Sequence, residues 1–136
     1  MKQILFIHPI GQSFALLFGF FNTITGCTRR WFNLPIHINC GAIYYFVSLS
    51  GAGMGVFVSK WAHKNGIVYD MDIHELAAML MVLCLAIGAT TGFIMLINKE
   101  KRLGLLKYHR WVNIFGLFIF CLQGITGISL LIKLFK

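Results

Sequence analysis

The sequence predicts an all-α membrane protein, a four-helix transmembrane bundle with up-down-up-down topology. Of its 136 residues, 58% are hydrophobic and 12% are charged, whereas soluble domains are about 25% charged. The mean hydropathy is +0.78, and a soluble domain of this size could not bury so much apolar surface. Four apolar stretches each reach the roughly 20 residues needed to cross about 30 Å of hydrocarbon. We therefore expect residues 1–136 to form a single transmembrane domain.

The first expected helix runs from about residue 4 to 26. Its apolar run could also be the core of a signal peptide, but polar or helix-breaking residues interrupt it: His8, Pro9, Gln12 and Asn22. A signal core is a short uninterrupted apolar segment. We therefore interpret this stretch as a membrane helix.

The other three helices are expected over about residues 36–59, 73–97 and 105–131. Pro35 suits the first turn of the second helix, and Asp70 or Asp72 suits the start of the third. Tryptophans fall near predicted helix ends, as in the aromatic belt of a membrane protein: Trp31, Trp61 and Trp111.

The basic residues lie almost entirely between the apolar stretches. The formal net charge of +8 therefore indicates membrane-flanking anchors in contact with lipid, and it does not indicate nucleic-acid binding. Seven basic residues lie on the side of the first and third connections and five on the other: Arg29, Arg30, Lys99, Lys101, Arg102, Lys107 and Arg110, against Lys2, Lys60, Lys64, Lys133 and Lys136. By the positive-inside rule, both termini are expected outside the cytoplasm.

Four of the five histidines lie one per predicted helix, each within about two turns of its N-terminal end. Antiparallel threading places His8 and His74 near one membrane face and His37 and His109 near the other, while His63 falls in the polar second connection. Ionisable residues at membrane depth are costly and usually functional. Histidines that only bridge helices by hydrogen bonds are the alternative interpretation.

Two imidazoles at one depth on facing helices are what a bis-histidine haem requires, and a bundle core can supply them. The sequence therefore predicts two haem b groups (heme b), one held by His8 and His74 and the other by His37 and His109. The Cys-x-x-Cys-His attachment motif is absent, so any haem is expected to be non-covalent. Cationic side chains are expected near the haem propionates, and Arg110 directly follows a proposed ligand.

A glycine lies eighteen residues after each of these four histidines, at Gly26, Gly55, Gly92 and Gly127. Eighteen residues are five turns, so each glycine shares the face of its histidine about 27 Å along the helix. We expect these glycines to lie at the depth of the opposite haem and to leave room for it. Close packing of transmembrane helices through small residues is the other interpretation.

Two segments carry a resemblance to a known family. His8-Pro9-Ile10-Gly11 and Lys107-Tyr108-His109-Arg110-Trp111 are similar to the starts of the first and last core helices of the cytochrome b561 family. The chain also resembles the small diheme membrane subunits of bacterial respiratory and reductase complexes. The resemblance implies the same pairs, His8 with His74 and His37 with His109. It also implies a bacterial inner membrane.

The expected function is electron relay across the bilayer by a diheme b-type cytochrome, as a subunit of an oxidoreductase more than as a stand-alone enzyme. A quinone or a redox partner subunit, such as a c-type cytochrome or a reductase, would exchange electrons with it. The alternative is a cofactor-free membrane anchor or assembly subunit. A divalent-metal transporter is disfavoured because the predicted midplane holds no acidic residue or histidine.

Overall fold

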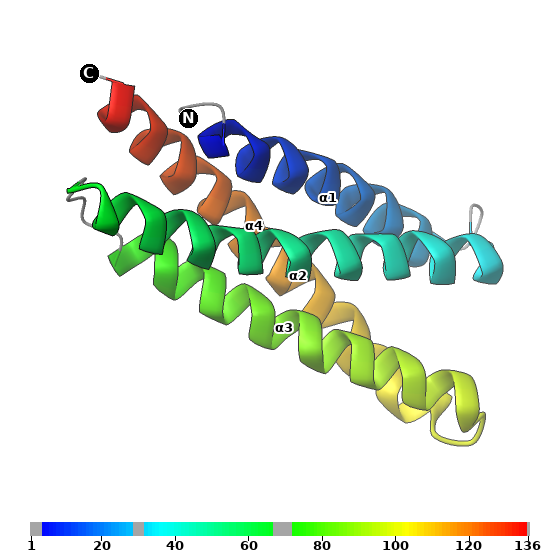
Figure 1. Cartoon of the computed structure of the whole chain (residues 1–136). Coiled ribbons are helices and arrows are strands. Elements are labelled where there is room, and N and C mark those ends of the chain that lie inside the picture. Colours follow the sequence, from blue (N-terminus) through cyan, green and yellow to red (C-terminus); the bar gives the residue numbers. More distant parts are fainter. Residues whose placement is uncertain (1–3, 29–31, 67–71, 136) are drawn as a thin grey trace.

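The computed structural model describes residues 4–28, 32–66 and 72–135. Its four helices are α1 (Ile4–Cys27), α2 (Leu34–Lys64), α3 (Asp72–Ile97) and α4 (Arg102–Phe135). Successive helices run in opposite directions, and the start of α1 and the end of α4 lie at the same end of the bundle (Figure 1). The predicted all-α, up-down-up-down fold is confirmed.

Two helices extend beyond the ends predicted for them. α2 continues to Lys64 and α4 to Phe135, past the expected ends at residues 59 and 131. Hydropathy indicates where the apolar part of a helix ends. The helix makes its own backbone hydrogen bonds, so it can continue past that point into the membrane–water interface. The 34 residues of α4 span about 50 Å, more than the roughly 30 Å of hydrocarbon. The placement of His63 in a loop was therefore wrong, because it lies in the last turn of α2.

The start and end of α2 are fixed by residues suited to those positions. The side-chain oxygen of Asn33 accepts a hydrogen bond from the Ile36 N–H at 3.2 Å, and Pro35 occupies the first turn as predicted. At the other end, Asn65 caps the helix and Gly66 has a φ of +71°, a left-handed conformation open to glycine. α3 begins at Asp72, whereas the alternative start at Asp70 lies outside the described residues.

A short turn joins α3 to α4. The Asn98 side-chain oxygen accepts hydrogen bonds from the Glu100 and Lys101 N–H groups at 3.1 and 3.2 Å. The Arg102 guanidinium donates to the Met95 carbonyl at 3.3 Å, one of the carbonyls that the end of a helix leaves without an intrahelical partner. These bonds hold α3 and α4 as an antiparallel hairpin.

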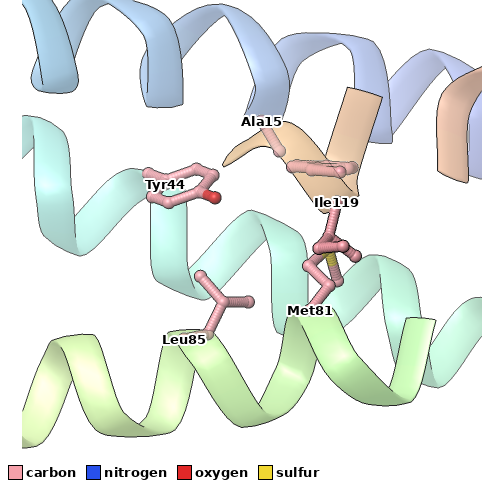
Figure 2. Close-up of a cluster of buried hydrophobic side chains, with 6 residues drawn as sticks. Ala15, Tyr44, Met81, Leu85 and Ile119 are labelled. Atoms are coloured by element: carbon pink, nitrogen blue, oxygen red, sulfur yellow. The ribbon is translucent and has the colours of Figure 1, made fainter. Parts of the chain in front are cut away.

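The helices form a four-sided bundle in which sequential neighbours pack together. α1 packs against α2 and α4, while α3 packs extensively against α4 and much less against α2. α1 and α3 are therefore diagonal to one another, as are α2 and α4. A cluster of buried side chains joins all four helices near mid-depth (Figure 2): Ala15, Tyr44, Met81, Leu85, Ile119 and Phe120.

The outer surface of the bundle is apolar. Each helix exposes large hydrophobic side chains, among them Phe14, Phe46, Met79 and Phe118. All four helices are long and apolar enough to cross a membrane, so this surface faces lipid. The protein is a multi-pass integral membrane protein.

Two methionines on α3 provide a test of the core. Met81 is fully buried, whereas Met79 is 66% exposed. We expect Met81→Ala to lower the free energy of unfolding by about 2–5 kcal/mol, because the cavity lies where all four helices meet. Met79→Ala should change it by about 0.5 kcal/mol or less. Unfolding in detergent–SDS mixtures followed by circular dichroism measures both, and equal effects would contradict the packing described.

Candidate functional site

Four of the five histidines lie half-buried within the bundle, and His63 is exposed at its end. The structure brings His37 of α2 and His109 of α4 together, with ring centroids 6.3 Å apart and planes inclined by 73°. At the other end, His8 of α1 and His74 of α3 are close enough to interact electrostatically. Each pair therefore joins diagonal helices that do not pack directly against each other.

Each predicted glycine lies against the histidine of the neighbouring helix in its hairpin. A Cβ atom added at Gly26 would lie 2.8 Å from Cε1 of His37, and one at Gly55 would lie 3.2 Å from Cε1 of His8. In the second hairpin, a Cβ at Gly92 or Gly127 would lie 3.1 Å from Cε1 of His109 or His74. These separations are too short for a side chain without movement of the imidazole.

The glycines therefore leave room for imidazole rings. Each helix has its histidine near one end of the bundle and its glycine near the other. The glycine lies at the depth of the histidine pair at that other end, as the eighteen-residue spacing predicts. The expectation that they also lie beside a macrocycle stays a prediction.

The two hairpins differ in how they hold Nδ1 of the histidine. In the α3–α4 hairpin, Nδ1 of His74 lies 2.9 Å from the Thr126 hydroxyl oxygen. Nδ1 of His109 lies 3.0 Å from the Gly88 carbonyl and 3.1 Å from the Thr91 hydroxyl. Both nitrogens therefore have oxygen partners on the neighbouring helix.

In the α1–α2 hairpin, the corresponding nitrogens lack such partners. The Nδ1 atoms of His8 and His37 are buried and make no hydrogen bond within the described structure, although they interact with the backbone at Gly51 and Asn22. A buried polar atom without a partner is uncommon in a native structure and calls for an explanation. A ligand that reorients the ring is one such explanation.

Amide side chains lie one turn inward from the histidines. Gln12, one turn after His8, fills the space beside Gly51, and its Nε2 lies 3.4 Å from the Ser48 carbonyl. Similarly, Asn113, one turn after His109, fills the space beside Gly88 and accepts a hydrogen bond from the Tyr45 hydroxyl at 2.6 Å. Small residues on one helix thus accommodate amides on its neighbour.

Among the described residues, no three histidine, cysteine or acidic side chains gather as they would around a metal ion held by protein alone. The cysteines in these segments are free: Cys27, Cys40, Cys84 and Cys121. A paired-imidazole site thus supplies two ligands and needs the others from a cofactor. Arg110 is exposed, and its contact with a propionate stays a prediction.

No protein-family model matches the chain, and no curated protein or solved structure matches it either.

Sequence reasoning missed the role of the threonines that precede the glycines. Thr91 and Thr126 each stand immediately before a glycine that contacts a histidine, and Thr25 holds the same position before Gly26. The recurring Thr-Gly pair is visible in the sequence, where it indicates a weak internal repeat. The threonine and the histidine lie far apart in the sequence, so the hydrogen bond that forms when the helices pack cannot be predicted from the sequence.

The glycine contacts can be tested within α4. A Cβ at Gly127 would press on the His74 ring, whose Nδ1 is held by Thr126, whereas Gly124 has no neighbour within 4 Å. Gly124→Ala should raise the free energy of unfolding by up to about 1 kcal/mol, because alanine favours helix over glycine. Gly127→Ala should lower it. Equal stabilisation by both substitutions, measured by SDS unfolding, would contradict the contact.

Proposed function

We propose that the protein is a diheme b-type membrane cytochrome that relays electrons between the two faces of the bilayer. One haem b is held by His37 and His109, and the other by His8 and His74. The observation that carries the proposal is the placement of His37 beside His109 at a ring-centroid distance of 6.3 Å.

That distance suits two imidazoles on opposite sides of one iron. With metal–nitrogen bonds of roughly 2 Å, the ring centroids of two imidazoles that ligate one metal ion would lie roughly 6 Å apart. The two histidines come from diagonal helices, which do not pack against each other directly. A haem would supply four pyrrole nitrogens, and His37 and His109 would hold its iron as the two protein ligands.

The partners of Nδ1 support the same assignment. A histidine that ligates a metal through Nε2 donates its Nδ1–H to an oxygen, which fixes the ring. His109 has the Gly88 carbonyl as such a partner, and His74 has the Thr126 hydroxyl. These contacts leave Nε2 available as the electron-pair donor. A haem bound there would supply one-electron exchange between ferric and ferrous iron.

The two pairs lie at different depths of the membrane. The eighteen-residue spacing from a histidine to the glycine at the other pair corresponds to about 27 Å along the helix, close to the thickness of the hydrocarbon. Between these levels the bundle is filled by the apolar cluster, in which the rings of Tyr44 and Phe120 have centroids 6.2 Å apart. This arrangement favours relay between two faces over chemistry at one buried centre.

The proposed partners exchange electrons at the two faces. The helices leave little chain outside the membrane in the described structure, so a quinone or a redox partner subunit, such as a c-type cytochrome or a reductase, is proposed as donor or acceptor. We place the protein in a bacterial inner membrane with both termini outside the cytoplasm. Within an oxidoreductase it would act as the electron-transfer subunit.

The proposal is tested by the visible spectrum and haem content of the purified protein. We expect a Soret band and two acid-acetone-extractable haems per chain. His74→Ala and His109→Ala should each remove one haem and leave the other, because each pair lies at its own end of the bundle. Spectrophotometry of the pyridine haemochrome gives the count.

His63→Ala is the matched control, because His63 lies in α2 but is exposed at the bundle end. It should retain two haems. Absence of a Soret band in the wild-type protein would instead favour the cofactor-free anchor or assembly subunit. Loss of both haems in each single variant, with the fold intact, would contradict independent pairs.

A further inference from the structure

The hydrogen bonds around Thr126 favour one tautomer of the His74 ring. The Thr126 hydroxyl donates to the Gln123 carbonyl at 3.0 Å and lies 2.9 Å from Nδ1 of His74. A hydroxyl has one proton and two lone pairs. With its proton directed to the carbonyl, the hydroxyl oxygen has lone pairs to accept from His74, which favours the tautomer with the hydrogen on Nδ1. In that tautomer Nε2 is the unprotonated nitrogen.

Thr91 repeats the arrangement at the other end of the same hairpin. Its hydroxyl donates to the Ile87 carbonyl at 2.8 Å and lies 3.1 Å from Nδ1 of His109. The Gly88 carbonyl is a second acceptor for that nitrogen, at 3.0 Å. The ring of His109 is thus held by two oxygens.

In the described structure, the α1–α2 hairpin has no hydrogen bond between a threonine hydroxyl and a histidine. Thr25 stands before Gly26, but its hydroxyl bonds the Phe21 and Asn22 carbonyls of its own helix and no bond to His37 is formed. At the fourth position, Met54 precedes Gly55 and has no hydroxyl to offer to His8. Only two of the four equivalent positions therefore carry a threonine bonded to the histidine.

We infer that Thr126 and Thr91 are positioning residues, which hold His74 and His109 as Nδ1–H imidazoles with Nε2 free to ligate iron. Each haem site thereby has one ring fixed by the α3–α4 hairpin and one ring from the α1–α2 hairpin that is fixed only when its ligand is bound. This inference rests on the proposed function for the identity of the bound group. The orientation of the rings stands without it.

Potentiometric titration of the two haems tests the inference. Nδ1–H donation to oxygen makes an imidazole a stronger donor and favours ferric iron. Thr126→Val should therefore raise the midpoint potential of one haem, by up to about a 10-fold change in the ratio of reduced to oxidised haem, or about 59 mV for one electron. Thr91→Val should raise the midpoint potential of the other haem, because it removes one of the two oxygens that hold His109. The electron paramagnetic resonance g-values should change at the same site.

Three variants keep the test specific. Thr126→Ser retains the hydroxyl and should restore the wild-type potential. Thr90→Val, at an exposed neighbour of Thr91, and Thr25→Val, at the equivalent position of α1, should shift neither potential. Unchanged potentials in Thr126→Val with two haems bound, or equal shifts in Thr25→Val, would overturn the inference.

A second measurement separates this inference from the proposed function. If the wild-type protein binds no haem, the proposed function fails, and nitrogen-15 NMR of the histidine rings then tests the positioning alone. His74 should be an Nδ1–H tautomer in the wild-type chain and a mixture in Thr126→Val. A mixture in both, or the Nε2–H tautomer in the wild type, would overturn the role of Thr126.

Discussion

A histidine inside a lipid-embedded bundle needs space beside a neighbouring helix and a partner for its ring nitrogens, because hydrocarbon offers neither water nor ions. The bundle meets the first need with four glycines and the second, in the α3–α4 hairpin, with threonine hydroxyls and a helix carbonyl. The alternating direction of the helices then places the histidines of diagonal helices at the same depth. The rest of the site depends on this accommodation of imidazole.

The two hairpins share the same histidine–glycine contacts but differ in the hydrogen bonds made by the histidines. In each hairpin, the histidine near the start of one helix contacts a glycine of the other helix. That glycine lies five turns beyond the other helix's own histidine. The α3–α4 hairpin adds hydrogen bonds to Nδ1, whereas the nitrogens of His8 and His37 lack them. In the proposed cytochrome, each haem would have one histidine already held by hydrogen bonds and one histidine that becomes fixed when the haem binds.

Hydropathy and spacing predict most of the fold and the position of the site. The four spans, their alternating direction and the level of each histidine follow from apolar run length and helical rise, both local properties of the chain. The extension of α2 to Lys64 cannot be predicted in this way, because backbone hydrogen bonding continues past the apolar run. The hydrogen bond between His74 and Thr126 cannot be predicted either, because these residues are 52 positions apart and meet only when α3 and α4 pack.

The proposed function requires two histidines on diagonal helices to ligate one iron. Low-temperature electron paramagnetic resonance of the oxidised wild-type protein tests it most directly, because axial ligation sets the spin state of ferric haem. We expect two low-spin ferric signals, each of a bis-imidazole haem, and no high-spin component. A dominant high-spin signal, or haem with a single imidazole ligand, would contradict it.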